Sequence, residues 1–274
     1  MRRFPFALLT ALLVLTLPAA AATAKPKPHD LLPDLAQGTP SGVAIVVDDS
    51  TGTPQVRLVF ESTIANVGSG PLILAGRRNP GSDAMTGHQL IRRSDGSTRT
   101  VRRSAGTLRY VHESDHEHWH LMGIDHYELW TADGSRRLRR DRKQGFCLGD
   151  RYQLFPGRRI AHQPRRPAYP GYCGRHQPQL TRVLEGITVG WGDVYPANIE
   201  GQYIDVTGVA PGRYLLVHRI SVGGLVEVNP YNDVSCAAID LTAPAVAGGP
   251  PTVTVLPGRT LCTASYRHWG VRTR

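Results

Sequence analysis

The stretch QVRLVFESTIANVG, residues 55 to 68, decides the fold class. It is rich in β-branched and aromatic side chains, and the turn signal VGSGP (67–71) ends it. Short segments of this composition, bounded by Gly, Pro, Asn or Asp, are typical of β-strands. The same pattern recurs in segments 41–49, 125–130, 202–209, 213–222 and 251–256. No stretch has a sustained apolar period of 3.6 residues, so the sequence predicts an all-β protein, with a β-sandwich core or an open barrel fitting best. We expect the β-sandwich core.

Long irregular loops are expected between these strands. Segment 151–190 has no strong periodicity and contains much Pro, Arg and Gly. We therefore predict that it forms one long loop, and long loops in a compact domain are more often functional than idle.

The first 24 residues have the features of a secretory signal peptide. Two arginines precede an apolar run from Phe6 to Leu17, and Ala22-Thr23-Ala24 has the small residues of a cleavage site. This run is too short to span a bilayer, which needs about 20 apolar residues, and no later segment is long and apolar enough. We expect a signal peptide at 1–24, a secreted domain at 25–274 and no membrane span.

The four cysteines favour two disulfides. Their even number and an oxidising compartment outside the cytoplasm argue against free thiols. Of the three possible pairings we favour Cys147 with Cys173 and Cys236 with Cys262, because each closes a short local loop. A four-cysteine zinc site is the alternative, but the chain has no CxxC spacing.

The chain is strongly basic. Its formal net charge is +10, and subtracting the two arginines of the signal leaves +8. The positive charge is concentrated in residues 92–109 and 136–143. Such runs can steer anionic partners, but we interpret both as solvated hairpin loops on a basic surface. Neither run is interleaved with aromatic residues, so we do not expect nucleic-acid binding.

The segment HEHWH, residues 116–120, carries the main candidate for chemistry. It places three histidines at alternate positions, His116, His118 and His120. Alternate side chains of a strand share a face, so Glu117 and Trp119 should point the other way. The outer Cα atoms would be about 13 Å apart in a flat strand, so we expect the strand to coil or bulge here. Three imidazoles suit Cu²⁺ or Zn²⁺. His112 and His126 are weaker candidates, which we expect either to support the metal ligands or to have a structural role.

These residues resemble the lysyl oxidases, extracellular copper amine oxidases. The segment from His116 to Trp130 is similar to that family's copper-binding segment. KQGFCLGD (143–150) and DVYPANIEGQYIDVTGVAPGRYLL (193–216) resemble the segments that hold its cofactor lysine and tyrosine. EVNPYNDVSC (227–236) and LCTASY (261–266) resemble its last disulfide segment. The similarity covers roughly residues 30 to 266.

The resemblance implies a copper-binding catalytic domain with a self-generated quinone. Copper(II) would be held by the three histidines, and dioxygen and copper would convert Tyr195 and Lys143 into lysine tyrosylquinone. The mature cofactor would oxidise a primary amine, either a peptidyl lysine or a small molecule, to an aldehyde. Dioxygen would reoxidise it, with release of hydrogen peroxide and ammonia. In such enzymes the protein positions the reactants and the cofactor performs the chemistry.

Animal members of the family have a further histidine where this chain has Glu113. Glu113, Asp115 and Asp125 are candidate proton acceptors for the oxidation. Two other functions remain open. One is a secreted β-sandwich protein that binds copper or zinc without catalysis, and the other is a zinc hydrolase, for which Glu113 or Glu117 would have to act as the base.

Overall fold

The structure is a computed structural model that describes residues 27–112, 117–141, 145–197, 199, 201–220, 224–246, 249–258 and 262. The predicted signal peptide, His116 and Lys143 lie outside the described residues, as do Glu113 and Asp115. Among the described residues, no helix is long and apolar enough to cross a membrane.

The described residues form eighteen strands and no helical element, which confirms the all-β prediction. All strand pairs are antiparallel, and they form three sheets. The first sheet has the order β11 (Gly145–Phe146), β8 (His118–Met122), β7 (Thr98–Val111), β6 (Ala84–Arg93), β5 (Leu72–Arg77) and β13 (Arg182–Ile187), with β1 (Asp30–Leu31) on β6. The second has the order β10 (Arg137–Arg140), β9 (Asp125–Thr131), β16 (Gly212–Ile220), β17 (Val234–Thr242) and β18 (Thr252–Val255). The third contains β12 (Tyr152–Gln153), β14 (Trp191–Tyr195), β4 (Gln55–Asn66) and β15 (Tyr203–Asp205), with β2 (Leu35–Gln37) and β3 (Ser41–Asp48) also on β4.

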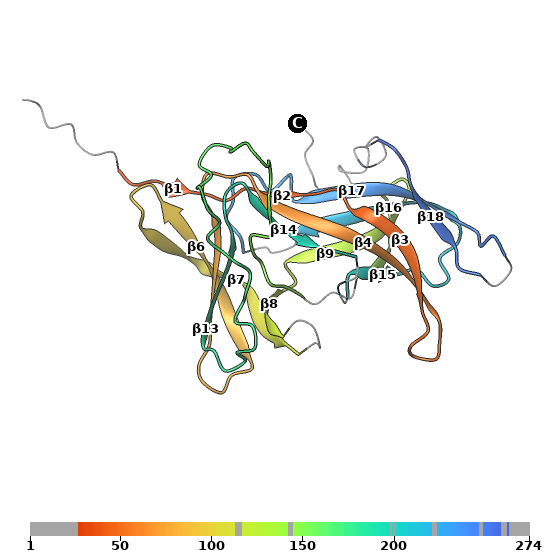
Figure 1. Ribbon diagram of the computed structural model, residues 1–274, viewed down its shortest axis with the longest axis horizontal. Coiled ribbons are helices and arrows are strands. Elements are labelled where there is room, and N and C mark those ends of the chain that lie inside the picture. Colours follow the sequence, from red (N-terminus) through yellow and green to blue (C-terminus); the bar gives the residue numbers. More distant parts are fainter. Residues whose placement is uncertain are drawn as a thin grey trace, which may run out of the picture.

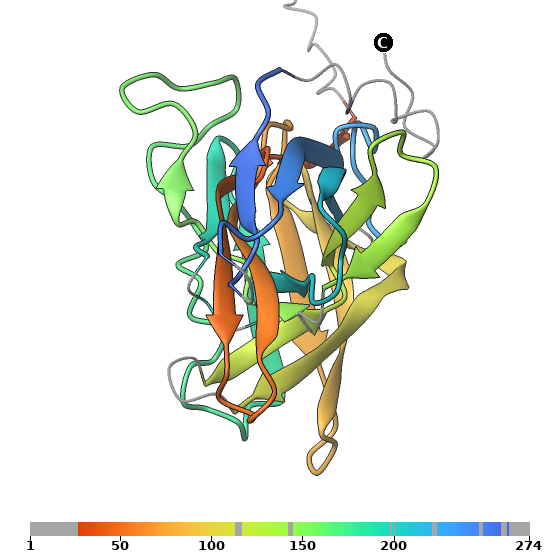
Figure 2. The ribbon, with the colours of Figure 1, turned by 90° about the vertical axis from the view of Figure 1, so that its right-hand side faces the viewer.

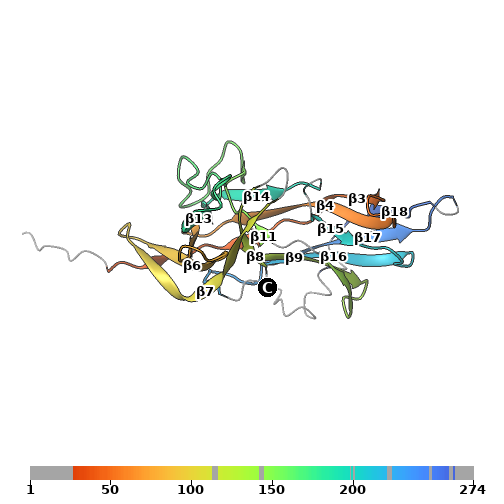
Figure 3. The ribbon, with the colours of Figure 1, turned by 90° about the horizontal axis from the view of Figure 1, so that it is seen from below.

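The second and third sheets pack face to face as a sandwich. Strands β3, β4 and β14 lie in one layer and β9 and β16 in the other, as Figure 3 shows. Alternate residues of β4 point into the interface, where Leu58 and Phe60 are completely buried. The Phe60 ring meets the Tyr127 ring of β9 edge to face, with 4.8 Å between ring centroids. The sheet that contains β6, β7 and β13 occupies one end of the molecule (Figure 1), and the β3–β4 hairpin and β16 to β18 lie at the other (Figure 2).

Three segments differ from their predicted structure. In the basic run at 136–143, which we expected to be a hairpin loop, residues Arg137–Arg140 form β10 and pair with β9. Residues 182–187, which we expected to be part of a long loop, form β13 and pair with β5 along its whole length. The buried Glu185 interrupts the apolar pattern there, which concealed the strand. The basic run at 92–109, which we expected to be a hairpin loop, lies mostly on the two strands of the β6–β7 hairpin. Most of its charged side chains occupy the solvent-facing positions of these strands, so a strand can carry them. The chain between Leu154 and Thr181 is irregular, as predicted.

Both favoured disulfides are present. One joins Cys147 to Cys173 and the other joins Cys236 to Cys262. The first ties the chain after β11 to the irregular segment 154–181, and the second lies against Leu215 and Val217 of β16. Only the first of the two is therefore attached to the segment that borders the candidate site.

Candidate functional site

Strand β8 presents two of the three predicted metal ligands on one face. The ring centroids of His118 and His120 are 4.7 Å apart. Trp119 points to the opposite face, where it is completely buried and meets Tyr110 edge to face at 5.6 Å. The alternation expected from the sequence therefore holds in the described part of the segment. Pairing of β8 with β7 is regular from His118 onward, and His116, where we expected coiling, lies outside the described residues.

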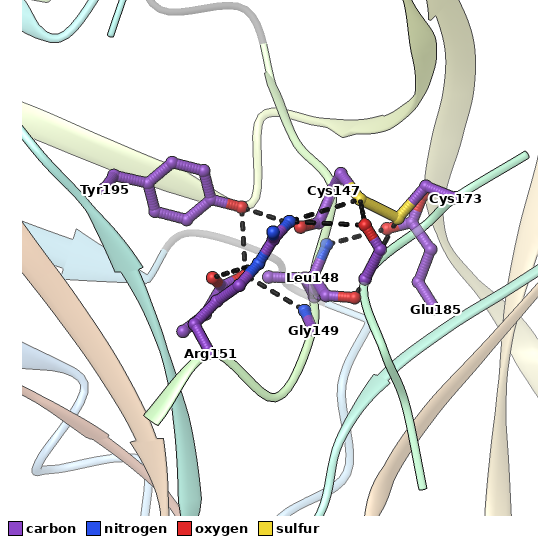
Figure 4. The surroundings of a disulfide bond; sticks show 9 residues. Cys147, Leu148, Gly149, Arg151, Cys173, Glu185 and Tyr195 are labelled. Atoms are coloured by element: carbon purple, nitrogen blue, oxygen red, sulfur yellow. Dashed lines mark hydrogen bonds and ion pairs between the residues drawn. A yellow bond between two sulfur atoms is a disulfide. The ribbon is translucent and has the colours of Figure 1, made fainter. Parts of the chain in front are cut away.

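Tyr195 ends β14 and is held on several sides. Its ring stands edge-on to that of Phe146, with 4.5 Å between centroids. Its hydroxyl lies 2.9 Å from the Cys147 carbonyl oxygen and 3.0 Å from Oδ2 of Asp193. The side chain is 7% exposed, and Figure 4 shows its hydroxyl directed toward the chain next to the Cys147–Cys173 disulfide. The phenol is therefore fixed by packing and by hydrogen bonding.

A pocket of about 450 Å³ brings the two histidines and the tyrosine together. His118 and His120 come from β8 of the first sheet, and Tyr195 comes from β14 of the third. The remaining wall includes Cys147, Arg151, Pro170, Tyr172, Arg175, Pro196 and Ile199. The pocket therefore joins residues from separate sequence segments, with the 154–181 segment forming part of its rim.

Two buried carboxyls, Asp193 and Glu185, lie close to residues that line this pocket. Asp193 is completely buried, and burial raises its pKa to about 7, while Arg151 opposes the rise with its Nε 3.4 Å from Oδ1. Burial also raises the pKa of Glu185 well above its usual value. Oε2 of Glu185 accepts a hydrogen bond of 3.3 Å from the Leu148 amide. The pKa of the Tyr195 phenol is raised well above its usual range by burial and by the neighbouring Asp193 charge.

Two described residues that follow Lys143 in the sequence contact Tyr195. Lys143 itself lies outside the described residues, but Phe146 and Cys147 both contact Tyr195.

Among the described residues, the candidates His112, His126 and Asp125 do not line this pocket. His126 lies 3.7 Å from Asp141, and exposed His112 packs against Tyr110. Asp125 is buried in the sandwich, where its Oδ2 lies 2.5 Å from Nε2 of His218 and accepts a hydrogen bond of 3.2 Å from the Tyr127 hydroxyl. These contacts indicate a structural role.

Glu117 points away from the two described histidines, as alternation predicted. Its carboxylate lies 3.2 Å from Nδ1 of His176, and both side chains are exposed. Among the described residues that line the pocket, none is Asp or Glu, and a hydrolytic zinc site would need a base there.

Sequence reasoning missed Asp193, Glu185 and Arg151. The spacing of Asp193 and Tyr195, two residues apart on one strand, was a usable signal because such side chains share a face. No local pattern reveals Glu185 or Arg151, which approach through tertiary contacts.

The two described histidines are suited to a metal such as copper. Imidazole nitrogens on one strand face are good donors for Cu²⁺, and both rings line a pocket that can hold an ion and a small ligand. No group of three or more His, Cys, Asp or Glu side chains in metal-binding arrangement occurs among the described residues. The third predicted ligand, His116, lies outside them.

Comparisons with known proteins agree with the resemblance in the sequence. A family model described as lysyl oxidase matches residues 92–242. The chain is 33% identical to human protein-lysine 6-oxidase over 126 residues, which is 45% of this chain and 26% of the human protein. It is 31% identical to the chicken (Gallus gallus) protein-lysine 6-oxidase over 121 residues, 44% of this chain and 25% of that protein. It is 30% identical to the zebrafish (Danio rerio) lysyl oxidase homolog 3B over 155 residues, 54% of this chain and 16% of that protein. The matched part thus spans about a quarter or less of the length of these relatives.

Proposed function

Because this chain belongs to the lysyl oxidase family, we propose that it is a secreted copper-dependent amine oxidase. It would convert primary amines to aldehydes with release of hydrogen peroxide and ammonia. The observation that supports this most strongly is the shared pocket of His118, His120 and Tyr195. The sequence resemblance assigned these residues to copper and cofactor from separate motifs, and all three line one cavity, which supports the proposal.

Copper would be held by His118 and His120 together with His116. When bound, copper would supply the oxidative chemistry with dioxygen that turns Tyr195 and Lys143 into lysine tyrosylquinone. The chain's own residues fix the reacting ring. Phe146 packs against Tyr195, and the Cys147 carbonyl and Asp193 carboxylate restrain its hydroxyl. Proper positioning of reacting groups supplies much of the rate in such reactions.

The pocket suits an amine on a flexible chain. Its volume of about 450 Å³ is within the ordinary range for small-ligand sites, and Pro170, Pro196 and Ile199 supply apolar wall for an alkyl stem. A peptidyl lysine of an extracellular or cell-surface protein and a small primary amine both have this form. We propose primary amines as the substrate class.

Secretion is supported by two features of the chain. The first 24 residues have the composition of a signal peptide. Two disulfides are typical of proteins outside the reducing cytoplasm.

The test is to load the protein with copper in air and supply primary amines of different length. We expect peroxide and aldehyde in equal amounts from the wild-type protein. The matched control is Tyr195→Phe, which keeps a ring against Phe146 and should bind copper without releasing peroxide. Copper binding without peroxide from any amine would instead support the non-catalytic metal-binding function.

A further inference from the structure

Among the described residues, Asp193 is the only carboxyl within hydrogen-bond distance of the Tyr195 hydroxyl. The two side chains lie on one face of β14, because they are two residues apart. Oδ2 of Asp193 also accepts a hydrogen bond of 3.0 Å from the Gly149 amide, and Oδ1 accepts one of 2.9 Å from the Val194 amide. With Arg151 3.4 Å from Oδ1, these donors fix the buried carboxylate in one orientation.

We propose that Asp193 positions the Tyr195 phenol and accepts its proton when the ring is converted into the cofactor. This inference rests on the proposed function. In the step, the O–H bond of Tyr195 breaks and an O–H bond forms on Oδ2 of Asp193. This proton transfer moves no electrons. The electrons leave the ring in the later oxidation, in which dioxygen accepts them. The net charge of the pair stays at minus one, next to the Arg151 guanidinium.

Among the described residues, neither of the other two groups near the Tyr195 hydroxyl can replace Asp193 as proton acceptor. The Cys147 carbonyl accepts the same hydroxyl hydrogen bond but is not a base at neutral pH. Glu185 bonds to the Leu148 amide. Burial raises the pKa of Tyr195 well above its usual range, so the phenol needs a base in contact with it to lose its proton near neutral pH.

The proton acceptor should impose a pH dependence on cofactor formation. Burial raises the pKa of Asp193 to about 7, and the ionisable groups that face it among the described residues are Arg151, Tyr152, Glu185 and Tyr195. Only ionised Asp193 can accept a proton, so the rate should be at its plateau above about pH 8. It should fall about tenfold for each unit below the pKa of Asp193.

The experiment follows cofactor formation in purified, metal-free protein after copper is added in air. The readout is the mass of the crosslinked Lys143–Tyr195 peptides with time, over a range of pH. Copper content is measured at each pH, because histidine ligands also bind protons in this range. Glu185→Gln is the matched control, since it removes a buried carboxyl that bonds to Leu148 and leaves Asp193 in place.

We expect the wild-type protein and Glu185→Gln to show the loss of rate at low pH. Asp193→Asn should slow crosslinking by about 100-fold or more and remove that pH dependence, while Asp193→Glu should restore part of the rate. Crosslinking of folded Asp193→Asn at the wild-type rate, or with the wild-type pH dependence, would overturn the inference.

Two further outcomes remain decisive. If Asp193→Asn does not fold, the other two proteins still test the inference. It is overturned if the crosslinking rate of the wild-type protein does not change with pH, or if Glu185→Gln loses the pH dependence. If the wild-type protein forms no crosslink at any pH, the proposed function fails.

Discussion

The two disulfides provide a matched pair of perturbations, because each joins cysteines 26 residues apart in the sequence. The chain-entropy relation for a loop of this length gives about 3.5 kcal/mol of stabilisation at 25 °C. Replacing either pair by alanine should therefore lower the free energy of unfolding by a similar amount. For a domain of this size, that loss corresponds to a fall of about 7 to 14 °C in Tm.

The two replacements should differ in their effect on the candidate site. The carbonyl oxygen of Cys147 accepts a hydrogen bond from the Tyr195 hydroxyl, and the Cys147–Cys173 disulfide fixes the wall of the pocket next to Gly171. Cys236 and Cys262 pack with Leu215 and Val217 in a separate apolar cluster. Loss of the first disulfide should therefore slow cofactor formation, whereas loss of the second should leave it unchanged at temperatures where both proteins are folded.

The assay has two parts. The first is thermal unfolding followed by circular dichroism. The second is the rate of Lys143–Tyr195 crosslinking, measured at 20 °C or, where the variants are less stable, at about 20 °C below the lower of the two Tm values. Equal losses of stability with unequal losses of crosslinking are expected. Equal crosslinking rates in the two double variants would refute the idea that the Cys147–Cys173 bond positions Tyr195. A large difference in Tm would show that loop entropy does not dominate their contributions to stability.

Three further changes test the structure. His118→Ala should remove most of the copper that survives dialysis against a weak chelator, whereas His126→Ala should retain it, as measured by metal analysis. His218→Phe leaves the buried Asp125 carboxylate without its ring partner and should cost about 3 kcal/mol in chemical denaturation; an unchanged midpoint would contradict the role assigned to this pair. Burial, with a smaller contribution from a neighbouring carboxyl, raises the pKa of Asp233 from 3.8 to about 9. The folded state therefore favours the neutral acid, and stability should be lost as pH rises from about 4 toward 9. Asp233→Asn should then raise Tm at about pH 8 and not at about pH 3, and a gain of the same size at both would argue against this titration.

The sequence was sufficient where the pattern is local. Segments 41–49 and 55–68 became β3 and β4 with nearly the predicted bounds, because β-branched composition and turn residues both favour strands there. The alternation of His118 and His120 predicted a shared face for the same reason. That these histidines share a site with Tyr195 could be predicted only from the family resemblance, because no local sequence pattern relates β8 to β14.

The sequence was insufficient where burial and tertiary contact decide the role. Asp125 was a candidate proton acceptor, but it pairs with His218, 93 positions away in the chain. Asp193 was overlooked although it contacts Tyr195. Its buried position and its proximity to Arg151 depend on the packing of β14 against the chain after β11, which no periodic pattern encodes.

The most direct test of the proposed function is peptide mapping of protein produced with copper in air. Intact mass and tryptic digestion would show whether the peptides of Lys143 and Tyr195 are covalently joined, with Tyr195→Phe as the control. We expect a joined pair in the wild-type protein and separate peptides in the variant. Copper bound at the histidines with the two wild-type peptides still separate would contradict the proposal that this chain makes its own quinone cofactor.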